Sequence, residues 1–259
     1  MGKNNKILNT NKTLNSWKYL TGNKELLQEN LEIIVEKSTE LIINGTPLLS
    51  FFCSPNELEA LTIGYLWNEH IIDHLDDILN LRISPDLTQI DVSISHFQND
   101  GKKPTRTSSG MVVSGKNEII HEKQSFTINP KTLIRLYDDF SEKQKLHKSA
   151  GGYHSAALSD GKLINIIVED LGRHNCLDKI SGKFLLEGRS FSPKLLFLSG
   201  RISSEMINKS LRLGVPLIAT RTTPTVSAVE IAEANGITIV GYLRGSQFST
   251  FTCPERLIF

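Results

Sequence analysis

The C-terminal half of the chain alternates short apolar runs with stretches in which apolar residues recur at helical spacing. The apolar runs predict buried strands at 163–168, 194–198, 215–219 and 237–243. The helical spacing predicts helices at 177–185, 203–213 and 224–234. Because the connections are short, we expect right-handed crossovers between parallel strands, preceded by a hairpin that Asp160-Gly161 turns. This pattern predicts an α/β fold, a mixed sheet flanked by helices.

Before residue 100 the pattern is richer in strands than in helices. Strand-like runs lie at 31–35, 40–43, 47–52, 78–83 and 90–97. Asn44-Gly45 predicts a hairpin turn between the second and third of these runs. Ser54-Pro55-Asn56-Glu57 combines a capping box with a proline at the first helical position, which predicts a helix running to Ile71. Asn129-Pro130 predicts a second helix, which ends near Lys145.

These patterns divide the chain into three segments. Residues 1–24 are rich in Asn, Lys and Thr and hold no acid before Glu25, which predicts a mobile basic tail; a partner-binding arm is the alternative. Residues 25–145 form an N-terminal β-rich and helical portion with a loop at 98–117, and 146–259 form an α/β ligand-binding portion. We expect 25–259 to be one continuous domain, with residues 107–116 exposed and poorly ordered.

Composition narrows the class of protein. A net charge of +1 over 259 residues gives no bulk attraction to nucleic acid or to a membrane surface. The sequence has no apolar run of 18 residues, and its N-terminus lacks the apolar segment of a signal peptide. Three widely spaced cysteines argue against a disulfide framework and fit a reducing compartment, so we expect a cytoplasmic protein.

Four arginines follow directly after the four predicted strands of the C-terminal half. They are Arg173, Arg201, Arg221 and Arg244. Because the carboxyl ends of parallel strands share one edge of a sheet, we expect these arginines on one rim, where α/β sheets bind ligands. Glycines beside three of them permit close backbone approach, and two helix N-termini add their dipoles. Since guanidinium groups match phosphate oxygens bidentately, the sequence predicts a phosphate or pyrophosphate site.

The densest group of polar residues is the turn at 169–179, between the first of these strands and its helix. Its position predicts contact with a ligand. The structural alternative is that Asp170 or Asn175 only caps the helix and that His174 makes one hydrogen bond within the fold.

Other catalytic signatures are missing from the sequence. It has no GxxxxGK[ST], no GxGxxG after a strand, no H-x-E with P-C-x-x-C of zinc deaminases and no G-x-S-x-G. Cys253, His154 and His174 lack the spacing of metal ligands, so we predict no structural metal. The sequence therefore indicates binding of a phosphate-bearing ligand more strongly than it indicates a reaction.

Two segments are similar to signatures of a known family. Residues 151–158 read GGYHSAAL, close to GGTHAAAL, and residues 169–179 read EDLGRHNCLDK, close to EDVGRHNAxDK. Further matches lie upstream at Cys53-Ser54-Pro55, Leu58-Glu59-Ala60-Leu61 and Gly64, and downstream at Ser199-Gly200-Arg201, Ser204-Glu205-Met206, Pro224-Thr225, Leu243-Arg244-Gly245 and Cys253-Pro254-Glu255-Arg256. They run in order over residues 30–257. On these residues the chain is identified as a member of the formate dehydrogenase accessory sulfurtransferases, the FdhD family.

The resemblance implies a cytidine-deaminase-like α/β fold, a homodimer and binding of the bis-molybdopterin guanine dinucleotide cofactor, of which guanosine diphosphate (GDP) is a fragment. It also implies that sulfur from a cysteine desulfurase reaches this cofactor before its insertion into the formate dehydrogenase apoprotein. By position, residues 242–248 resemble the cofactor-binding segment. Together with the rim, the predicted cofactor-binding residues are Arg173, His174, Asn175, Ser199, Gly200, Arg201, Arg221, Thr225, Tyr242, Leu243, Arg244, Gly245, Ser246, Gln247 and Phe248.

One departure from the family concerns the sulfur itself. The family carries it on a loop of the form SSCGxCGK or SSGCG, whereas residues 108–116 of this chain read SSGMVVSGK, with Gly110-Met111 at the cysteine position. Persulfide chemistry requires a thiolate, which a methionine thioether cannot replace.

Three interpretations follow from the missing loop cysteine. The chain is a cofactor-binding chaperone, a sulfurtransferase that uses another thiol, or an unrelated nucleotide-binding enzyme on the same scaffold. Cys176, near a helix N-terminus in the turn 169–179, is the candidate replacement thiol, and a small buried residue is its alternative role.

Overall fold

A computed structural model of the chain describes residues 10–22, 24–95, 105–107, 110–112, 125–188 and 190–259. Its larger part is built on a six-stranded sheet of order β10-β9-β11-β12-β13-β14. The strands are β9 (His154–Ser159), β10 (Ile164–Asp170), β11 (Leu195–Leu198), β12 (Leu217–Thr220), β13 (Thr238–Arg244) and β14 (Gln247–Thr250). β11, β12 and β13 are parallel and the other pairs are antiparallel, which confirms the predicted mixed α/β sheet.

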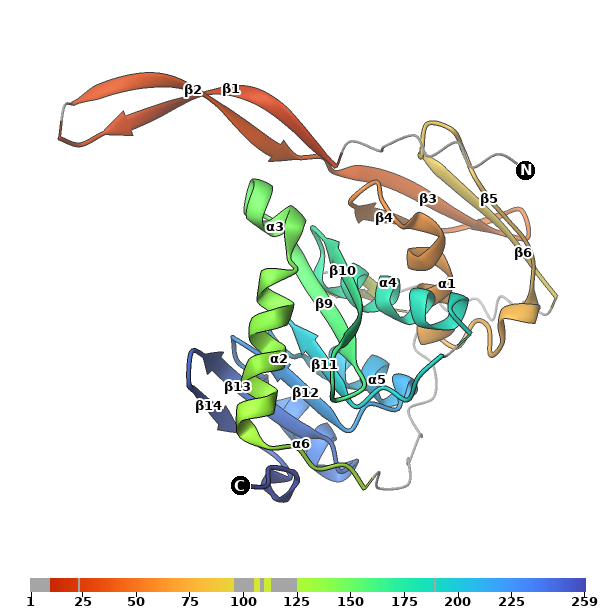
Figure 1. Cartoon of the computed structure of the whole chain (residues 1–259). Coiled ribbons are helices and arrows are strands. Elements are labelled where there is room, and N and C mark those ends of the chain that lie inside the picture. The colour runs from red at the N-terminus through yellow and green to blue at the C-terminus, as the bar shows by residue number, and fades with distance from the viewer. Residues whose placement is uncertain (1–9, 23, 96–104, 108–109, 113–124, 189) are drawn as a thin grey trace.

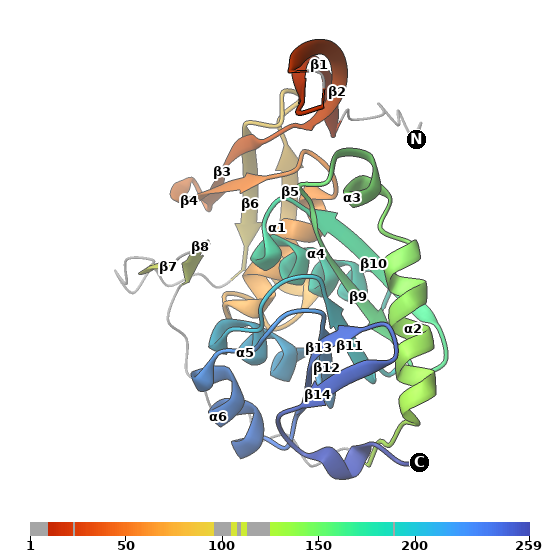
Figure 2. The ribbon, with the colours of Figure 1, turned by 90° about the vertical axis from the view of Figure 1, so that its left-hand side faces the viewer.

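Helices cover both faces of this sheet (Figures 1 and 2). One face packs against α2 (Pro130–Glu142), and the other lies toward α4 (Arg173–Leu186), α5 (Ser204–Leu213) and α6 (Val226–Ala234). β11 illustrates why: Leu195 and Phe197 belong to the core around α2, while Leu196 and Leu198 belong to the core on the opposite face. Because successive side chains of a strand point to opposite faces, a continuous apolar run suits a strand buried on both sides.

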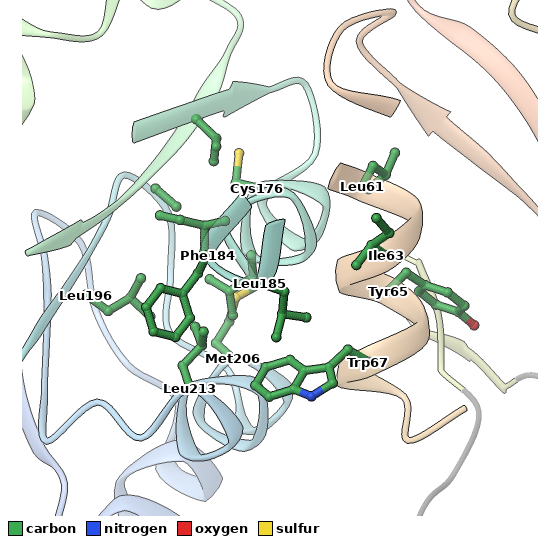
Figure 3. Close-up of a cluster of buried hydrophobic side chains, with 14 of the residues drawn as sticks. Leu61, Ile63, Tyr65, Trp67, Cys176, Phe184, Leu185, Leu196, Met206 and Leu213 are labelled. Atoms are coloured by element: carbon green, nitrogen blue, oxygen red, sulfur yellow. The ribbon is translucent and has the colours of Figure 1, made fainter. Parts of the chain in front are cut away.

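The N-terminal portion adds a second sheet of order β4-β3-β6-β5. Its strands are β3 (Lys37–Ile43), β4 (Thr46–Cys53), β5 (Ile78–Ile83) and β6 (Gln89–Ile94), and α1 (Leu58–Asn68) packs between this sheet and α4. Figure 3 shows Trp67 of α1 and Leu185 of α4 in one cluster with Met206 of α5. Buried side chains from both sheets therefore form a continuous core.

The prediction of a mobile tail at 1–24 is wrong for the described residues of that segment. β1 (Asn11–Leu20) pairs antiparallel with β2 (Glu25–Ile34) in a two-stranded ribbon that projects from the body (Figure 1). The base of the ribbon is anchored, since the hydroxyl of Tyr153 donates to the carbonyl of Thr10 and to Asn11 Oδ1 at 2.7 and 2.6 Å. Residues 1–9 lie outside the described part.

Helix boundaries depart from the predictions where side chains serve other contacts. α1 begins at Leu58, with Glu57 in left-handed backbone and no capping side chain, so the predicted capping box at 54–57 is wrong. Helix α1 ends at Asn68 instead of Ile71, and the predicted second helix ends at Glu142, before a separate α3 (Lys145–Ala150). Helix α6 begins at Val226 instead of residue 224, and Thr225 caps it by accepting from the backbone N–H of Ala228.

Four short elements complete the described chain: η1 (Leu75–Asp77), η2 (Pro254–Arg256), β7 (Thr105–Thr107) and β8 (Gly110–Val112). The last two fall within the predicted loop 98–117, and the rest of that loop lies outside the described residues. In the part of the chain that the structure describes, no helix is both long and apolar enough to cross a membrane.

Candidate functional site

The topology brings the polar ends of five strands to one edge of the six-stranded sheet. β10 is antiparallel to β9, and β9 is antiparallel to β11, so β10 runs in the same direction as β11, β12 and β13. The carboxyl ends of these four strands therefore share an edge with the amino end of β9, where His154 lies opposite Asp170. This edge, which we call the rim, carries all four predicted arginines at or directly after strand ends, as the sequence predicts.

Arg173 and Arg201 form one cationic group on the rim, and His154 lies beside it. A Cβ built on Gly200 would lie 3.3 Å from the Arg173 side chain and 3.3 Å from Nδ1 of His154, so both side chains pass close to this glycine. Burial and then the charge of Arg201 lower the pKa of Arg173. Burial and then the charge of Arg173 lower the pKa of His154. A bound anion would relieve the repulsion within this group.

Arg221 and Arg244 form a second cationic group, farther along the rim. Nε of Arg244 donates to the carbonyl of Arg221 at 3.3 Å, and both residues are exposed. Burial raises the pKa of Tyr137 to about 12, with the nearby charges of Arg221 and Arg244 acting in the opposite direction. Thr220 links the two groups, because its hydroxyl donates to the carbonyl of Gly200 at 2.7 Å.

The turn 169–179 divides into structural residues and residues that face the rim groups. Asp170 is fully buried, pairs with Lys179 at 2.6 Å and accepts from the backbone N–H groups of Ser54 and Gly172. The amide nitrogen of Asn175 donates to Asp170 and to the carbonyl of Phe52. Asp170 and Asn175 thus hold the turn in place without capping α4, while contact of Arg173 and His174 with a ligand stays a prediction.

His174 connects the rim to a buried ionic network that sequence reasoning missed. Its Nε2 lies 3.1 Å from Oε2 of Glu205, whose other carboxylate oxygen lies 3.7 Å from Nζ of Lys209. Lys209 also contacts Asp178 at 2.8 Å and Glu69 at 3.4 Å, and its ammonium is almost completely buried. The only local signal for this network is the spacing of four residues between Glu205 and Lys209.

The network makes stability depend on pH through Glu69. Burial raises the pKa of Glu69 to about 7, against the charge of Lys209, from an ordinary value near 4.5. A carboxyl whose pKa is higher in the folded than in the unfolded state contributes stability that is fully present below the unfolded-state pKa. This contribution is lost as the pH rises through the folded-state pKa. Between pH 5 and pH 8 the wild type should therefore lose about 2–3 kcal/mol relative to a variant without this titration.

Unfolding free energies in urea at pH 5 and at pH 8 measure this difference. Between these pH values the stability of Glu69→Gln should rise by about 2–3 kcal/mol relative to that of the wild type. The reason is that the amide resembles the protonated acid at both pH values. Glu59→Gln, an exposed change on α1 that leaves Glu69 in place, is the matched control and should lose stability between pH 5 and pH 8 as wild type does. An equal pH dependence of Glu69→Gln and wild type would contradict the assignment.

Residues 242–248, predicted to bind the cofactor, span the end of β13, the turn at Gly245-Ser246 and the start of β14. Tyr242 and Gly245 adopt left-handed backbone with φ of 53° and 56°. Tyr242, Arg244, Gly245, Ser246 and Gln247 are exposed, whereas Leu243 is buried and Phe248 half-buried. Six of these seven residues therefore present at least part of their surface beside the second cationic group.

The described thiols are buried. Cys176 is 1% exposed, and burial raises its pKa well above the ordinary value despite its place on the first turn of α4. Burial likewise raises the pKa of Cys53 to about 12, and Cys253 is 7% exposed. Because a thiolate is the reactive form, the structure argues against Cys176 as a replacement nucleophile and favours the alternative of a small buried residue. The described residues also contain no group of three or more His, Cys, Asp or Glu side chains arranged to hold a metal ion.

Comparisons with known proteins cover almost the whole chain. Residues 34–258 match the model of the FdhD/NarQ family. The sulfur carrier protein FdhD of Bacillus subtilis is 31% identical over 252 residues, which cover 93% of this chain and 95% of that protein. The protein of the same name from Staphylococcus aureus (strain MRSA252) is also 31% identical and covers 88% of this chain and 89% of its own length.

One solved structure resembles the fold throughout. A formate dehydrogenase accessory protein from Desulfotalea psychrophila superposes with a TM-score of 0.78, over 96% of this chain and 100% of that one. Its sequence identity is 21%, so this likeness speaks for the fold alone.

Proposed function

The chain belongs to the FdhD/NarQ family, and we propose that it is a formate dehydrogenase accessory protein that binds the bis-molybdopterin guanine dinucleotide cofactor at the rim. The observation that carries this proposal is the pair of cationic groups, Arg173 with Arg201 and Arg221 with Arg244, on one sheet edge. A guanine dinucleotide offers a pyrophosphate to these guanidinium groups. The expected partners are a second copy of the chain and the formate dehydrogenase apoprotein; a cysteine desulfurase is a partner only if the chain also transfers sulfur.

The rim suits such a ligand in two further respects. Gly200 lets Arg173 and His154 pack closely against the backbone, where a Cβ would lie 3.3 Å from both side chains, and α5 begins at Ser204, close after Arg201. Backbone N–H groups at a helix N-terminus favour anions, and the dipole of the helix has the same preference. Ser199, Thr225 and the turn 242–248 complete the set of proposed contacts.

Replacing Arg244 by Ala should weaken the binding of GDP by about 1.5–3 kcal/mol, because a charge-assisted hydrogen bond to phosphate is lost. Isothermal titration calorimetry with GDP measures this change. Arg82→Ala is the matched control, since Arg82 is an exposed arginine on β5 of the other sheet. Equal affinities of Arg244→Ala and wild type would remove Arg244 from the site.

A second candidate function is sulfur transfer, which the names of the relatives favour. A carrier thiolate attacks the terminal sulfur of the desulfurase persulfide, takes that sulfur and releases the desulfurase thiolate. Burial of Cys53, Cys176 and Cys253 opposes this step. We therefore propose the chaperone function, in which the protein binds the cofactor and passes it on without carrying sulfur.

Incubation with a cysteine desulfurase and cysteine, followed by intact-mass measurement under native conditions, separates the two functions. We expect the wild type to gain no sulfur. Met111→Cys, which places a thiol at the position of the single-cysteine loop of the family, should gain the mass of one sulfur atom and thereby show that the desulfurase is competent. Sulfur on wild-type Cys53, Cys176 or Cys253 would establish the carrier function instead.

A further inference from the structure

The β1–β2 ribbon projects from the body and contacts it only at its base, among the residues that the structure describes. Ten residues of each strand pair with one another, and within the described residues neither strand pairs with any other. Its contacts with the body lie at the base, where Asn11 bonds Ser149 and Tyr153 and where Ile34 lies against Gly152. A two-stranded ribbon alone is marginal in water, so a long projecting one needs a surface to pack against.

The ribbon exposes an unusual amount of apolar surface. Seven large side chains on it are more than 40% exposed: Leu14, Trp17, Tyr19, Leu26, Leu27, Leu31 and Ile33. From the areas of such side chains, they present roughly 700 Å² of surface per chain, divided between the two faces of the ribbon. Exposed apolar surface of this extent on a soluble protein points to an interaction site.

The strand register sorts these side chains into two different faces. Residues directly opposite each other share a face, and alternate pairs lie on opposite faces. Leu14 with Leu31 and Lys18 with Leu27 lie on one face, together with Glu29. Trp17 and Tyr19, paired with Gln28 and Leu26, lie on the other. The first face, which we call the leucine face, combines apolar side chains with charges of both signs.

The charges on the ribbon are separated by strand. β1 contains Lys12 and Lys18 and no acid, whereas β2 contains three glutamates, Glu25, Glu29 and Glu32, and no base. Edge-to-edge pairing of two identical ribbons about a twofold axis would place like strands, and so like charges, side by side. Face-to-face packing about an axis along the ribbon places the basic strand of each copy over the acidic strand of the other.

We propose that the leucine face of the β1–β2 ribbon packs against the same face of a second copy of this chain. The ribbon needs support, its two strands carry complementary charges, and the leucine face exposes four large apolar side chains, Leu14, Leu27, Leu31 and Ile33; all three features fit that occupant. This inference rests on the homodimer included in the proposed function and assigns the surface that forms it. Its failure is distinguishable from that of the cofactor-binding proposal, because GDP titration measures ligand affinity at the rim, whereas light scattering measures the oligomeric state.

The test is the molar mass of the full chain by light scattering, over a series of concentrations. The wild type should be a dimer, and Leu14→Glu with Leu31→Glu should raise its dissociation constant at least 100-fold. Leu79→Glu is the matched control, because Leu79 is 68% exposed on β5, away from the ribbon, and it should leave the mass unchanged. A dimer that survives the paired leucine changes would overturn the assignment of the ribbon and leave the homodimer intact, whereas a monomeric wild type would overturn both.

A charge exchange tests the packing arrangement. Lys12→Glu with Lys18→Glu makes both strands acidic, and Glu25→Lys with Glu29→Lys makes both strands basic on the leucine face, so each variant alone should dimerise at least 10-fold more weakly than wild type. An equimolar mixture should recover dimers that contain one copy of each. Mixing cannot repair a change within one chain, such as loss of the 3.8 Å pair between Lys18 and Glu29, so failure to recover would contradict face-to-face packing.

Discussion

Replacing Gly64 by Ala is expected to destabilise the protein by about 3 kcal/mol or more, although alanine favours a helix over glycine by about 1 kcal/mol. Gly64 lies where α1 crosses α4, and a Cβ there would stand 1.7 Å from the carbonyl oxygen of Asp178. Likewise, a Cβ added to Gly182 of α4 would stand 1.9 Å from the carbonyl oxygen of Ala60. The obstacle is backbone in both cases, so the methyl group can fit only if the helices move apart.

Urea unfolding of Gly64→Ala measures this effect. Gly22→Ala is the control, because no atom lies within 4 Å of the Cβ that it would add, and it should stay within about 0.5 kcal/mol of wild type. Since α4 begins with Arg173 and His174, separation of the helices should also weaken GDP binding while the protein is still folded. A Gly64→Ala variant as stable as wild type would show that the two backbones are not in contact.

Local patterns predict the parts of the fold in which neighbouring residues decide the structure. β11, β12 and β13 are apolar runs buried on both faces, and the helices between them have helical spacing. General rules for parallel strands then place Arg201, Arg221 and Arg244 on one edge without any knowledge of side-chain contacts. The rim is therefore predictable because it depends on topology alone.

The ribbon is unpredictable from the same patterns because both of its faces are exposed. A strand with one buried face alternates apolar and polar residues, whereas β1 places Trp17 and Tyr19 on one face and Leu14 on the other, all exposed. Composition then dominates the interpretation, and a segment rich in Asn, Lys and Thr is predicted to be mobile. The alternative of a partner-binding arm stays a prediction.

Contacts between distant segments explain the other errors. Ser54 resembles a helix cap in sequence, but its hydroxyl accepts from the backbone N–H of Leu171 and its own N–H donates to Asp170, more than a hundred residues away. Asn56, also in the predicted capping box, accepts from Nζ of Lys179. Thus a segment that predicts a local cap instead holds the turn 169–179 against the N-terminal portion.

These contacts make Asp170 the residue whose loss should damage both the fold and the rim. Its carboxylate is fully buried and receives the ammonium of Lys179 at 2.6 Å, together with the N–H groups of Ser54 and Gly172 at 3.1 and 2.8 Å. Asp170→Asn leaves Lys179 charged and unpaired in the core, and its amide group cannot accept all of these bonds. We expect a loss of about 3–5 kcal/mol of unfolding free energy in urea titration.

The matched control is another aspartate–lysine pair on the surface. Asp139 and Lys143 lie 2.8 Å apart, close to the 2.6 Å of the buried pair, but both are substantially exposed, so Asp139→Asn should cost about 0.5 kcal/mol or less. A double change, Asp170→Asn with Lys179→Met, should recover part of the stability that Asp170→Asn loses, because no buried charge then lacks a partner. If Asp170→Asn costs no more than Asp139→Asn, the buried pair does not hold the turn, and the orientation of Arg173 and His174 on the rim must come from the remaining contacts of α4.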